Sequence, residues 1–378
     1  MIYIPLSMSY PGMTLAESVS APSGLYSLLQ RGEVLSDVYI NRLSACNIDS
    51  IYVEMEGTEG IEPKSLISTK VKQEITNEFR SLYINYFNRP FISKSAIAST
   101  QLLAGKIVNN LLGCEEHLLD MMEIKNYDNY TYSHSLNVGI LSALLASEAG
   151  IKRSRLEDIT LCALMHDIGK LDIPIEIINK NGAVTPAEFD VIKTHPSKGV
   201  DRIRKCYNLS SEVLPGIQSH HEKFDGGGYP FGYSGTQIPL FGRILAISDV
   251  YDALTSQRSY RKAWHPKEAM EYIIKGSGSQ FDNHLVQLFS HLISVYPTGT
   301  LVKLSDGSVA VVVKNHTEDL FRPQVRLLEA SPLGKKGYEI DLFEDIRYCQ
   351  LAIASAQGTS DNNHFELHAP GSVSESAG

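Results

Sequence analysis

The sequence predicts a mainly α-helical protein, with a small α/β module before the helical part and a β-rich segment after it. Three observations support this fold class. Helical periodicity dominates residues 93–296, mixed helix and strand patterns occupy residues 1–64, and alternating apolar residues follow in residues 297–352. With 378 residues, 43% of them hydrophobic, the chain is long enough for one substantial core and one or two smaller units.

Residues 1–64 are predicted to form the small α/β module, which is a candidate sensor. Ser36 is predicted to be the N-cap of a short helix that ends near Cys46, because a serine hydroxyl can accept a backbone N–H of the first turn. Residues 50–54 have the β-branched and aromatic composition of a strand.

Residues 65–92 are predicted to form a connecting helix. Val71, Ile75 and Phe79 recur at helical spacing, as on one face of a helix, and Pro90 marks its end. This helix is a candidate surface for homodimerisation or for a signalling protein partner.

The helical part of the chain, residues 93–296, has a clear apolar face just before Gly169. Leu161, Leu164, Met165 and Ile168 form an i, i+3, i+4, i+7 set. This spacing predicts a helix with one buried face.

The segment 297–352 is predicted to be β-rich. Residues 300–304 and 309–313 flank a Ser-Asp-Gly-Ser turn, which indicates a β-hairpin, and residues 325–328 and 338–342 are candidates for two more strands. Residues 353–378 are rich in Ser, Gly and Asn, so we expect a disordered tail there.

Composition narrows the classes of partner. The 34 basic and 43 acidic residues give a net charge of -9, which disfavours binding to nucleic-acid polymers. The most apolar stretch, residues 138–151, is interrupted by Ser142, Ser147 and Glu148, so no membrane span is expected. The N-terminus lacks a signal-peptide pattern, and the five cysteines form no C-x-x-C pair, so we expect a cytoplasmic protein with reduced thiols.

Several histidines and aspartates in the helical part have the character of metal ligands. The candidates, in chain order, are His134, His166, Asp167, His195, His220, His221 and Asp249. Imidazole nitrogens and carboxylate oxygens suit divalent transition metals, and a helical bundle can direct such side chains inward from several helices. A single His-Asp pair more often has a structural role, but here the pair is one part of a larger set.

The strings around these residues resemble one known family. HD-x-G-K at His166, the His-Pro at His195, HHE-x-x-D-G-x-G-Y-P from His220 and D-V-Y-D-A-L-T-S-x-R-x-Y-R-K from Asp249 occur in the order typical of the HD-GYP subgroup of the HD superfamily. The resemblance covers roughly residues 115 to 295. It implies an HD-type helical bundle as the catalytic domain and a metal-dependent phosphodiesterase of cyclic dinucleotides.

The resemblance also implies a ligand set for two divalent transition-metal ions. The first would be held by His134, His166, Asp167 and Asp249, and the second by Asp167, His195, His220 and His221. This partition follows motif position, so individual ligands can exchange between the two ions. Iron and manganese are the favoured metals, with zinc and nickel as alternatives.

A third metal site is not expected. Members of the family with three metals carry a glutamate four residues before the first histidine, whereas this chain has Tyr130 there. A phenol is a poor ligand at neutral pH because its usual pKa is about 10.

Other residues are candidates for substrate contacts. Asp167 and Lys170 are the predicted catalytic residues, and Lys170 would neutralise phosphate or leaving-group charge, although a lysine there also suits a helix C-terminus. Gly228, Tyr229 and Pro230 form a close-approach loop, and the resemblance assigns Arg258, Arg261 and Lys262 to the second phosphate and the guanine edges. A solvated basic helix face is the alternative for that cluster.

The expected reaction is hydrolysis of cyclic di-GMP to pGpG, GMP or both, by a hydroxide that the two metals activate. Two alternatives stay open. One is a sensor that binds cyclic di-GMP but turns it over slowly, and the other is a phosphodiesterase that prefers 3′3′-cyclic GMP-AMP. Asp252 and Glu222 are candidates for orienting a ligating imidazole from behind.

Overall fold

The apolar patterns of the chain form two cores in the computed structural model, and each core belongs to one compact unit. The structure describes residues 1–20, 27–46, 48, 50–62, 66–87, 89, 91–113, 130–180, 182–204, 209–256 and 263–357. The first unit contains the described residues of Met1–Lys64 and Ser294–Gly378. The second contains those of Ser65–Lys125 and Asn129–Ile293.

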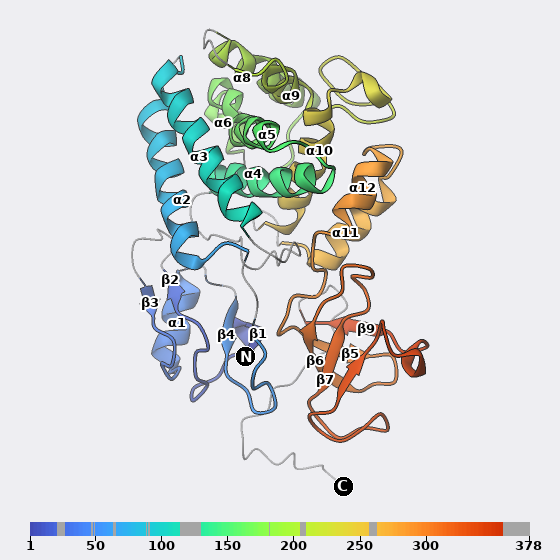
Figure 1. Ribbon diagram of the computed structural model, residues 1–378. Helices are drawn as coiled ribbons and strands as arrows, with labels where there is room; N and C mark the ends of the chain where they lie inside the picture. The colour runs from blue at the N-terminus through green and yellow to red at the C-terminus, as the bar shows by residue number, and fades with distance from the viewer. Residues whose placement is uncertain are drawn as a thin grey trace. The chain divides into compact units, whose positions relative to one another are not determined.

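The first unit is built mainly from short strands (Figure 1). Its elements are β1 Ile2–Pro5, η1 Leu6–Met8, β2 Val19–Ser20, β3 Ser27–Leu29, α1 Asp37–Ala45, β4 Ser50–Val53, β5 Leu301–Leu304, β6 Val309–Lys314, β7 Gln324–Leu327, β8 Glu339–Asp341, η6 Ile346–Tyr348 and β9 Ile353–Ala356. The predicted N-cap of α1 is confirmed, because the Ser36 hydroxyl accepts the backbone N–H of Tyr39.

The C-terminal strands form one antiparallel sheet in the order β8-β7-β6-β5-β9. The predicted hairpin is confirmed as β5 and β6, in which Leu301 pairs with Val311. The predicted start of the disordered tail at residue 353 is wrong, because Ile353–Ala356 form β9 and pair with β5. Buried Ile353 and Ala356 contribute apolar surface there. Residues 358–378 lie outside the described part of the chain.

The N-terminal module and the C-terminal sheet share one hydrophobic core. Leu15, Leu35 and Leu43 belong to the same buried cluster as Leu301 and Val311. The backbone N–H of Tyr3 also donates to the Gly299 carbonyl oxygen over 3.1 Å. The N-terminal module and the described C-terminal strands therefore fold against each other, while the division into five domains stays a prediction.

The second unit is helical in its described residues, as the sequence predicted (Figure 1). Its elements are α2 Thr69–Leu82, the π-helical turn η2 Tyr83–Phe87, α3 Lys94–Leu112, α4 Tyr130–Glu148, α5 Arg153–Met165, η4 Ile168–Asp172, α6 Ile175–Ile178, α7 Pro186–Ile192, α8 His195–Ile203, α9 Val213–Ser219, η5 Gly235–Gln237, α10 Leu240–Thr255, α11 Pro266–Lys275 and α12 Asn283–Phe289.

The predicted connecting helix packs within this helical unit. Ser68 caps α2, which contacts α3 and α4, and the helical turns end at buried Phe87. Arg202 of α8 donates to the Phe87 carbonyl oxygen and forms two hydrogen bonds with the carboxylate of Asp172 in η4. The end of this helix is therefore tied to the segment that follows the His-Asp pair.

Helix α5 delivers the His-Asp pair to the middle of the unit. It packs against α4 and α9, and its apolar face, which includes Leu161 and Leu164, is buried. The chain then turns into η4, which packs tightly on α8. Gly169 makes this approach possible, because a Cβ at its position would overlap the backbone of His195 and Gly199.

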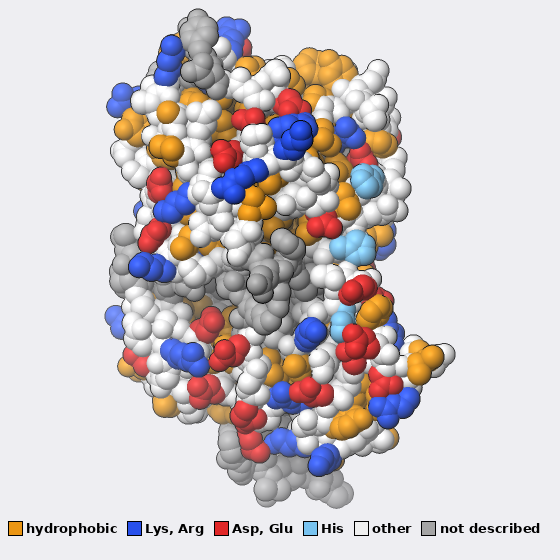
Figure 2. Space-filling view, viewed as in Figure 1, with side chains coloured by type: hydrophobic (Ala, Val, Ile, Leu, Met, Phe, Trp, Pro, Cys, Tyr) orange, Lys and Arg blue, Asp and Glu red, His pale blue; other side chains and the backbone are white. Residues whose placement is uncertain are grey.

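Charges of both signs lie on the face that Figure 2 shows. Basic and acidic side chains are mixed there, and neither sign covers a broad area. Among the helices of the described chain, none combines the length and the apolar character that a bilayer crossing requires.

Substitution of Gly169 tests the close packing of η4 on α8. We expect Gly169→Ala to lower the free energy of unfolding by about 3 kcal/mol, because the added methyl group meets backbone that cannot rotate away. The measurement is urea unfolding followed by helical circular dichroism. Gly105→Ala is the control, since its Cβ would lie 3.8 Å from the Glu157 side chain and alanine favours helices. Equal stability of the two variants would contradict the packing argument.

Candidate metal centre

Five helices bring the predicted ligand residues to one place in the helical unit. His134 lies in α4, His166 caps the C-terminus of α5, Asp167 precedes η4, His195 begins α8, His220 caps the C-terminus of α9 with His221 next to it, and Asp249 lies in α10. All are buried except His221, which is partly exposed. Residues distant in sequence therefore converge, as the motifs predicted.

One group of side chains surrounds the first oxygen of Asp167. Asp167 Oδ2 lies 3.3 Å from His166 Nε2 and 3.7 Å from His134 Nε2. His134 Nε2 in turn lies 3.1 Å from Asp249 Oδ1. Imidazole nitrogens and carboxylate oxygens, which are common metal ligands, therefore lie close together in this group.

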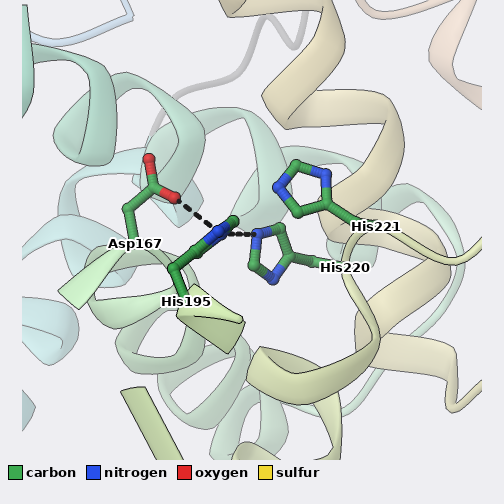
Figure 3. Close-up of side chains that lie close together, drawn as sticks. All are labelled: Asp167, His195, His220 and His221. Atoms are coloured by element: carbon green, nitrogen blue, oxygen red, sulfur yellow. Dashed lines mark hydrogen bonds and ion pairs between the residues drawn. The ribbon is translucent and has the colours of Figure 1, made fainter. Parts of the chain in front are cut away.

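A second group surrounds the other oxygen of Asp167 (Figure 3). Asp167 Oδ1 lies 3.3 Å from His195 Nε2, which lies 3.3 Å from His220 Nε2. Together with His221, one ligand atom from each of these residues falls within 4.8 Å of every other. The two groups therefore meet at separate oxygens of one carboxylate.

Asp249 lies between the two groups. Its Oδ1 is 3.9 Å from His166 Nε2, and its Oδ2 is 4.0 Å from His221 Nδ1. It also clusters with His166 and His220. Its position is therefore compatible with either group.

Backbone carbonyls fix the orientation of three imidazoles. The Nδ1 atoms of His166, His195 and His220 lie 2.7, 2.8 and 2.6 Å from the carbonyl oxygens three residues earlier, which belong to Ala163, Ile192 and Ile217. A carbonyl oxygen can only accept, so each Nδ1 carries a proton and each Nε2 is directed at the site. This is the ring orientation that a metal ligand bound through Nε2 needs.

Asp252 has the same function for His134. Its Oδ2 lies 2.6 Å from His134 Nδ1, and its Oδ1 accepts a hydrogen bond of 2.8 Å from the Asn137 amide. Asp252 was a candidate for this contact, whereas Asn137 was not identified from the sequence. Its signal was its position one turn after His134, on the same helix face.

Glu222 does not contact an imidazole in the way that was expected. Its Oε1 instead accepts the backbone N–H of Phe231 over 2.7 Å. This bond fastens the loop after His221 and leaves the orientation of the imidazoles to other groups.

Electrostatics favours ionised carboxylates and two neutral imidazoles. Burial opposes the charge of Asp167 and Asp249, but neighbouring imidazoles outweigh it at both residues, and Lys170 adds to this at Asp167, so both pKa values lie well below the ordinary value. Burial lowers the pKa of His220 well below its ordinary value and that of His221 to about 3. Metal ligands need these protonation states.

His134 differs from these imidazoles. Burial disfavours its charge, but hydrogen bonds to Asp249 and Asp252 are stronger and raise its pKa to about 9. A proton on Nε2 and a cation would therefore compete for the same position between His134 and Asp249.

Two buried polar atoms without a hydrogen-bond partner indicate that the site can bind a cation. His166 Nε2 and Asp167 Oδ1 are buried and have no hydrogen-bond partner. Leaving such atoms unpaired costs about 1–3 kcal/mol each, and a cation would satisfy both. The imidazole and carboxylate donors fit divalent transition metals, so the residues present could hold metal.

The predicted substrate residues lie at the edge of this site or outside the described chain. Lys170 Nζ lies 2.6 Å from Asp167 Oδ2, and its side chain is 34% exposed. The Tyr229 ring stacks on His221 at 4.8 Å, and Gly228 allows close approach to the backbone of Glu222. Pro230 follows in the same loop. The positions of Arg258, Arg261 and Lys262, and the side chain of Tyr130, lie outside the described part.

Known proteins are similar in sequence to the part of the chain that contains this site. A family model described as HD domain matches residues 116–285. A cyclic di-GMP phosphodiesterase of Pseudomonas aeruginosa is 34% identical over 269 residues, which are 71% of this chain and 63% of that protein. A cyclic di-GMP phosphodiesterase of Thermotoga maritima is 31% identical over 231 residues, with 59% and 62% covered. A 3′3′-cGAMP-specific phosphodiesterase of Vibrio cholerae is 35% identical over 159 residues, with 42% and 30% covered.

These matches span less than two thirds of the length of each relative. The HD domain match nevertheless includes every residue of the two ligand groups, from His134 to Asp249. The helical fold agrees with that match, so residues 116–285 form an HD domain, and the order of its motifs is similar to that of the HD-GYP subgroup.

Proposed function

We propose that this protein is a metal-dependent phosphodiesterase that hydrolyses cyclic di-GMP to pGpG, GMP or both. The observation that carries the proposal is the convergence of three imidazoles on Asp167, at 3.3 to 3.7 Å, from three different helices. The names of the Pseudomonas aeruginosa and Thermotoga maritima relatives support the substrate class.

The proposed centre holds two divalent transition-metal ions. The first takes His134, His166, Asp167 and Asp249, and the second takes Asp167, His195, His220 and His221. Iron or manganese is favoured, with zinc or nickel as alternatives, because the donors are nitrogen and oxygen without thiolate. The absence of a third ion stays a prediction from Tyr130.

Metal ions in such a pair supply an activated water and positive charge opposite the phosphate oxygens. The protein's own contribution is orientation. Hydrogen bonds from Nδ1 to backbone carbonyl oxygens hold the rings of His166, His195 and His220 in place. The carboxylate of Asp252 holds the ring of His134 in the same way. Rigid rings lower the reorganisation required when the phosphodiester binds.

Lys170 is the proposed electrostatic partner of the substrate. Its ammonium group is partly exposed and lies beside Asp167 Oδ2, so it can reach a phosphate oxygen or the departing ester oxygen. Gly228, Tyr229 and Pro230 line the proposed substrate side of the centre, next to His221. Arg258, Arg261 and Lys262 remain predicted binders of the second phosphate and the base.

A second candidate substrate is 3′3′-cyclic GMP-AMP. The Vibrio cholerae relative named for this nucleotide supports it. Comparing kcat/KM for the two cyclic dinucleotides, with manganese-loaded protein and chromatography of the products, distinguishes the candidates. Failure of the protein to cleave either nucleotide with any of the four metals would refute the proposed activity.

Removing the His-Asp pair tests the proposed centre. We expect His166→Ala combined with Asp167→Ala to abolish metal retention and hydrolysis, because both groups lose ligands and the bridge disappears. Elemental analysis of anaerobically purified protein and product chromatography are the measurements. The helical circular dichroism should stay largely unchanged, and Asp190→Ala, which removes an exposed carboxylate on α7, is the control. Retained turnover in the double variant would refute the assignment.

Replacing Asp252 tests the contact behind His134. We expect Asp252→Asn to weaken metal binding by about 10- to 100-fold, because the amide no longer stabilises the Nδ1-protonated ring as a carboxylate does. Titration of the metal-free protein with manganese measures the change. Metal affinity equal to that of the wild type would show that His134 needs no support from this carboxylate.

Lys170 is tested by removing its charge. We expect Lys170→Met to reduce kcat by about 100-fold while metal content stays constant, since one lost electrostatic contact in a transition state typically has that effect. Lys170→Arg keeps the charge and should recover part of the rate. If Lys170→Met loses metal instead, the lysine serves to neutralise Asp167 and has no direct contact with substrate.

A further inference from the structure

Two exposed aromatic side chains stand on the loop that joins α9 to α10. Phe231 is 50% exposed and Tyr233 is 39% exposed. Their ring centroids lie 4.8 Å apart and their planes differ by 23°, so the rings are stacked. Hydrophobic side chains also gather at the upper edge of Figure 2, where Figure 1 draws this loop.

The loop that carries the two rings is fastened to its surroundings. The Phe231 N–H donates to Glu222 Oε1 over 2.7 Å, and Glu222 is itself buried. Farther along, the Gly235 N–H donates to the Phe224 carbonyl oxygen and the Asp225 N–H donates to the Ser279 carbonyl oxygen, both over 2.8 Å. Binding of a ligand to these rings would therefore cost little conformational entropy, because the loop is already ordered.

The backbone connects the ring pair to the proposed metal centre. Tyr229, two residues before Phe231, stacks on His221 with an interplanar angle of 27°. Its N–H also donates to the His221 carbonyl oxygen over 3.2 Å. Glu222, which follows His221 directly, holds the backbone of Phe231. The exposed rings thus belong to a fixed stretch of backbone that begins at the ligand His221.

We propose that Phe231 and Tyr233 form a stacking platform for one purine base of the substrate. The inference rests on the proposed function, in which a phosphate of a cyclic dinucleotide lies at the metal centre. Aromatic side chains bind nucleobases through their π faces, and this stacking tolerates different bases. The platform therefore contributes affinity for guanine and adenine alike.

A protein partner fits this surface less well. Stable protein interfaces need roughly 800 Å² on each side, with a broad apolar centre. The residues that follow each ring in the sequence, Gly232, Ser234 and Gly235, are small and add little apolar area. Two rings on a rigid loop match the size of a single base.

Removing both rings tests the platform. We expect Phe231→Ala combined with Tyr233→Ala to raise KM for cyclic di-GMP by at least about tenfold, with kcat within about twofold and metal content unchanged. Phe231→Trp should leave KM at or below the wild-type value. Phe231→Leu, which keeps apolar volume but has no π face, should raise KM. Phe343→Ala, an aromatic side chain that is 41% exposed in the other unit, is the control.

A fluorescent probe gives a direct measurement of stacking. A cyclic dinucleotide that contains 2-aminopurine should lose fluorescence on binding to the metal-loaded wild-type protein and retain it with the double variant. Unchanged KM and equal quenching in the double variant would overturn the platform, and so would a wild-type KM in Phe231→Leu. Absence of hydrolysis by the wild type is a separate outcome that refutes the proposed function itself.

Discussion

One buried carboxylate, Asp167, constrains the helical unit. Its two oxygens face different sets of imidazoles, so α4, α5, α8 and α9 must all end or pass within a few ångströms of it. A buried negative charge is costly unless it is paired. Lys170 and the surrounding imidazoles pair with the charge of Asp167.

The packing around Asp167 follows from this constraint. Gly169 and Gly199 allow η4 and α8 to approach closely enough for His195 to reach the carboxylate. Helix ends supply the carbonyls that orient the rings, because the last carbonyls of a helix have no partner inside it. The same turns of backbone therefore terminate helices α5 and α9 and orient the rings of His166 and His220 in the proposed metal centre.

Much of the site could be predicted because the motifs specify residue type and order. The apolar face that includes Leu161 indicated a buried helix, and a histidine at its end had to lie inside the unit. The partner of Asp252 could not be predicted, since it depends on how α4 packs against α10. Asn137 and the loop contact of Glu222 depend on the same kind of tertiary contact.

The fold of the first unit was predictable only in pieces. The hairpin of β5 and β6 has its turn residues in the sequence, and Ser36 is a local cap. The shared core of Leu15 and Leu301 is not a local property, because either segment could bury its apolar face against other partners. Strand β9 is short and pairs with β5, about 50 residues earlier in the chain. Its few apolar residues gave a weak strand signal, and the polar composition of the residues that follow favoured a disordered tail instead.

Anomalous diffraction from crystals of the manganese-loaded protein tests the central proposal most directly. Two peaks roughly 3.5 to 4 Å apart, with one oxygen of Asp167 directed at each, are the expected result. A single peak, or peaks that do not involve Asp167, would contradict the two-metal centre.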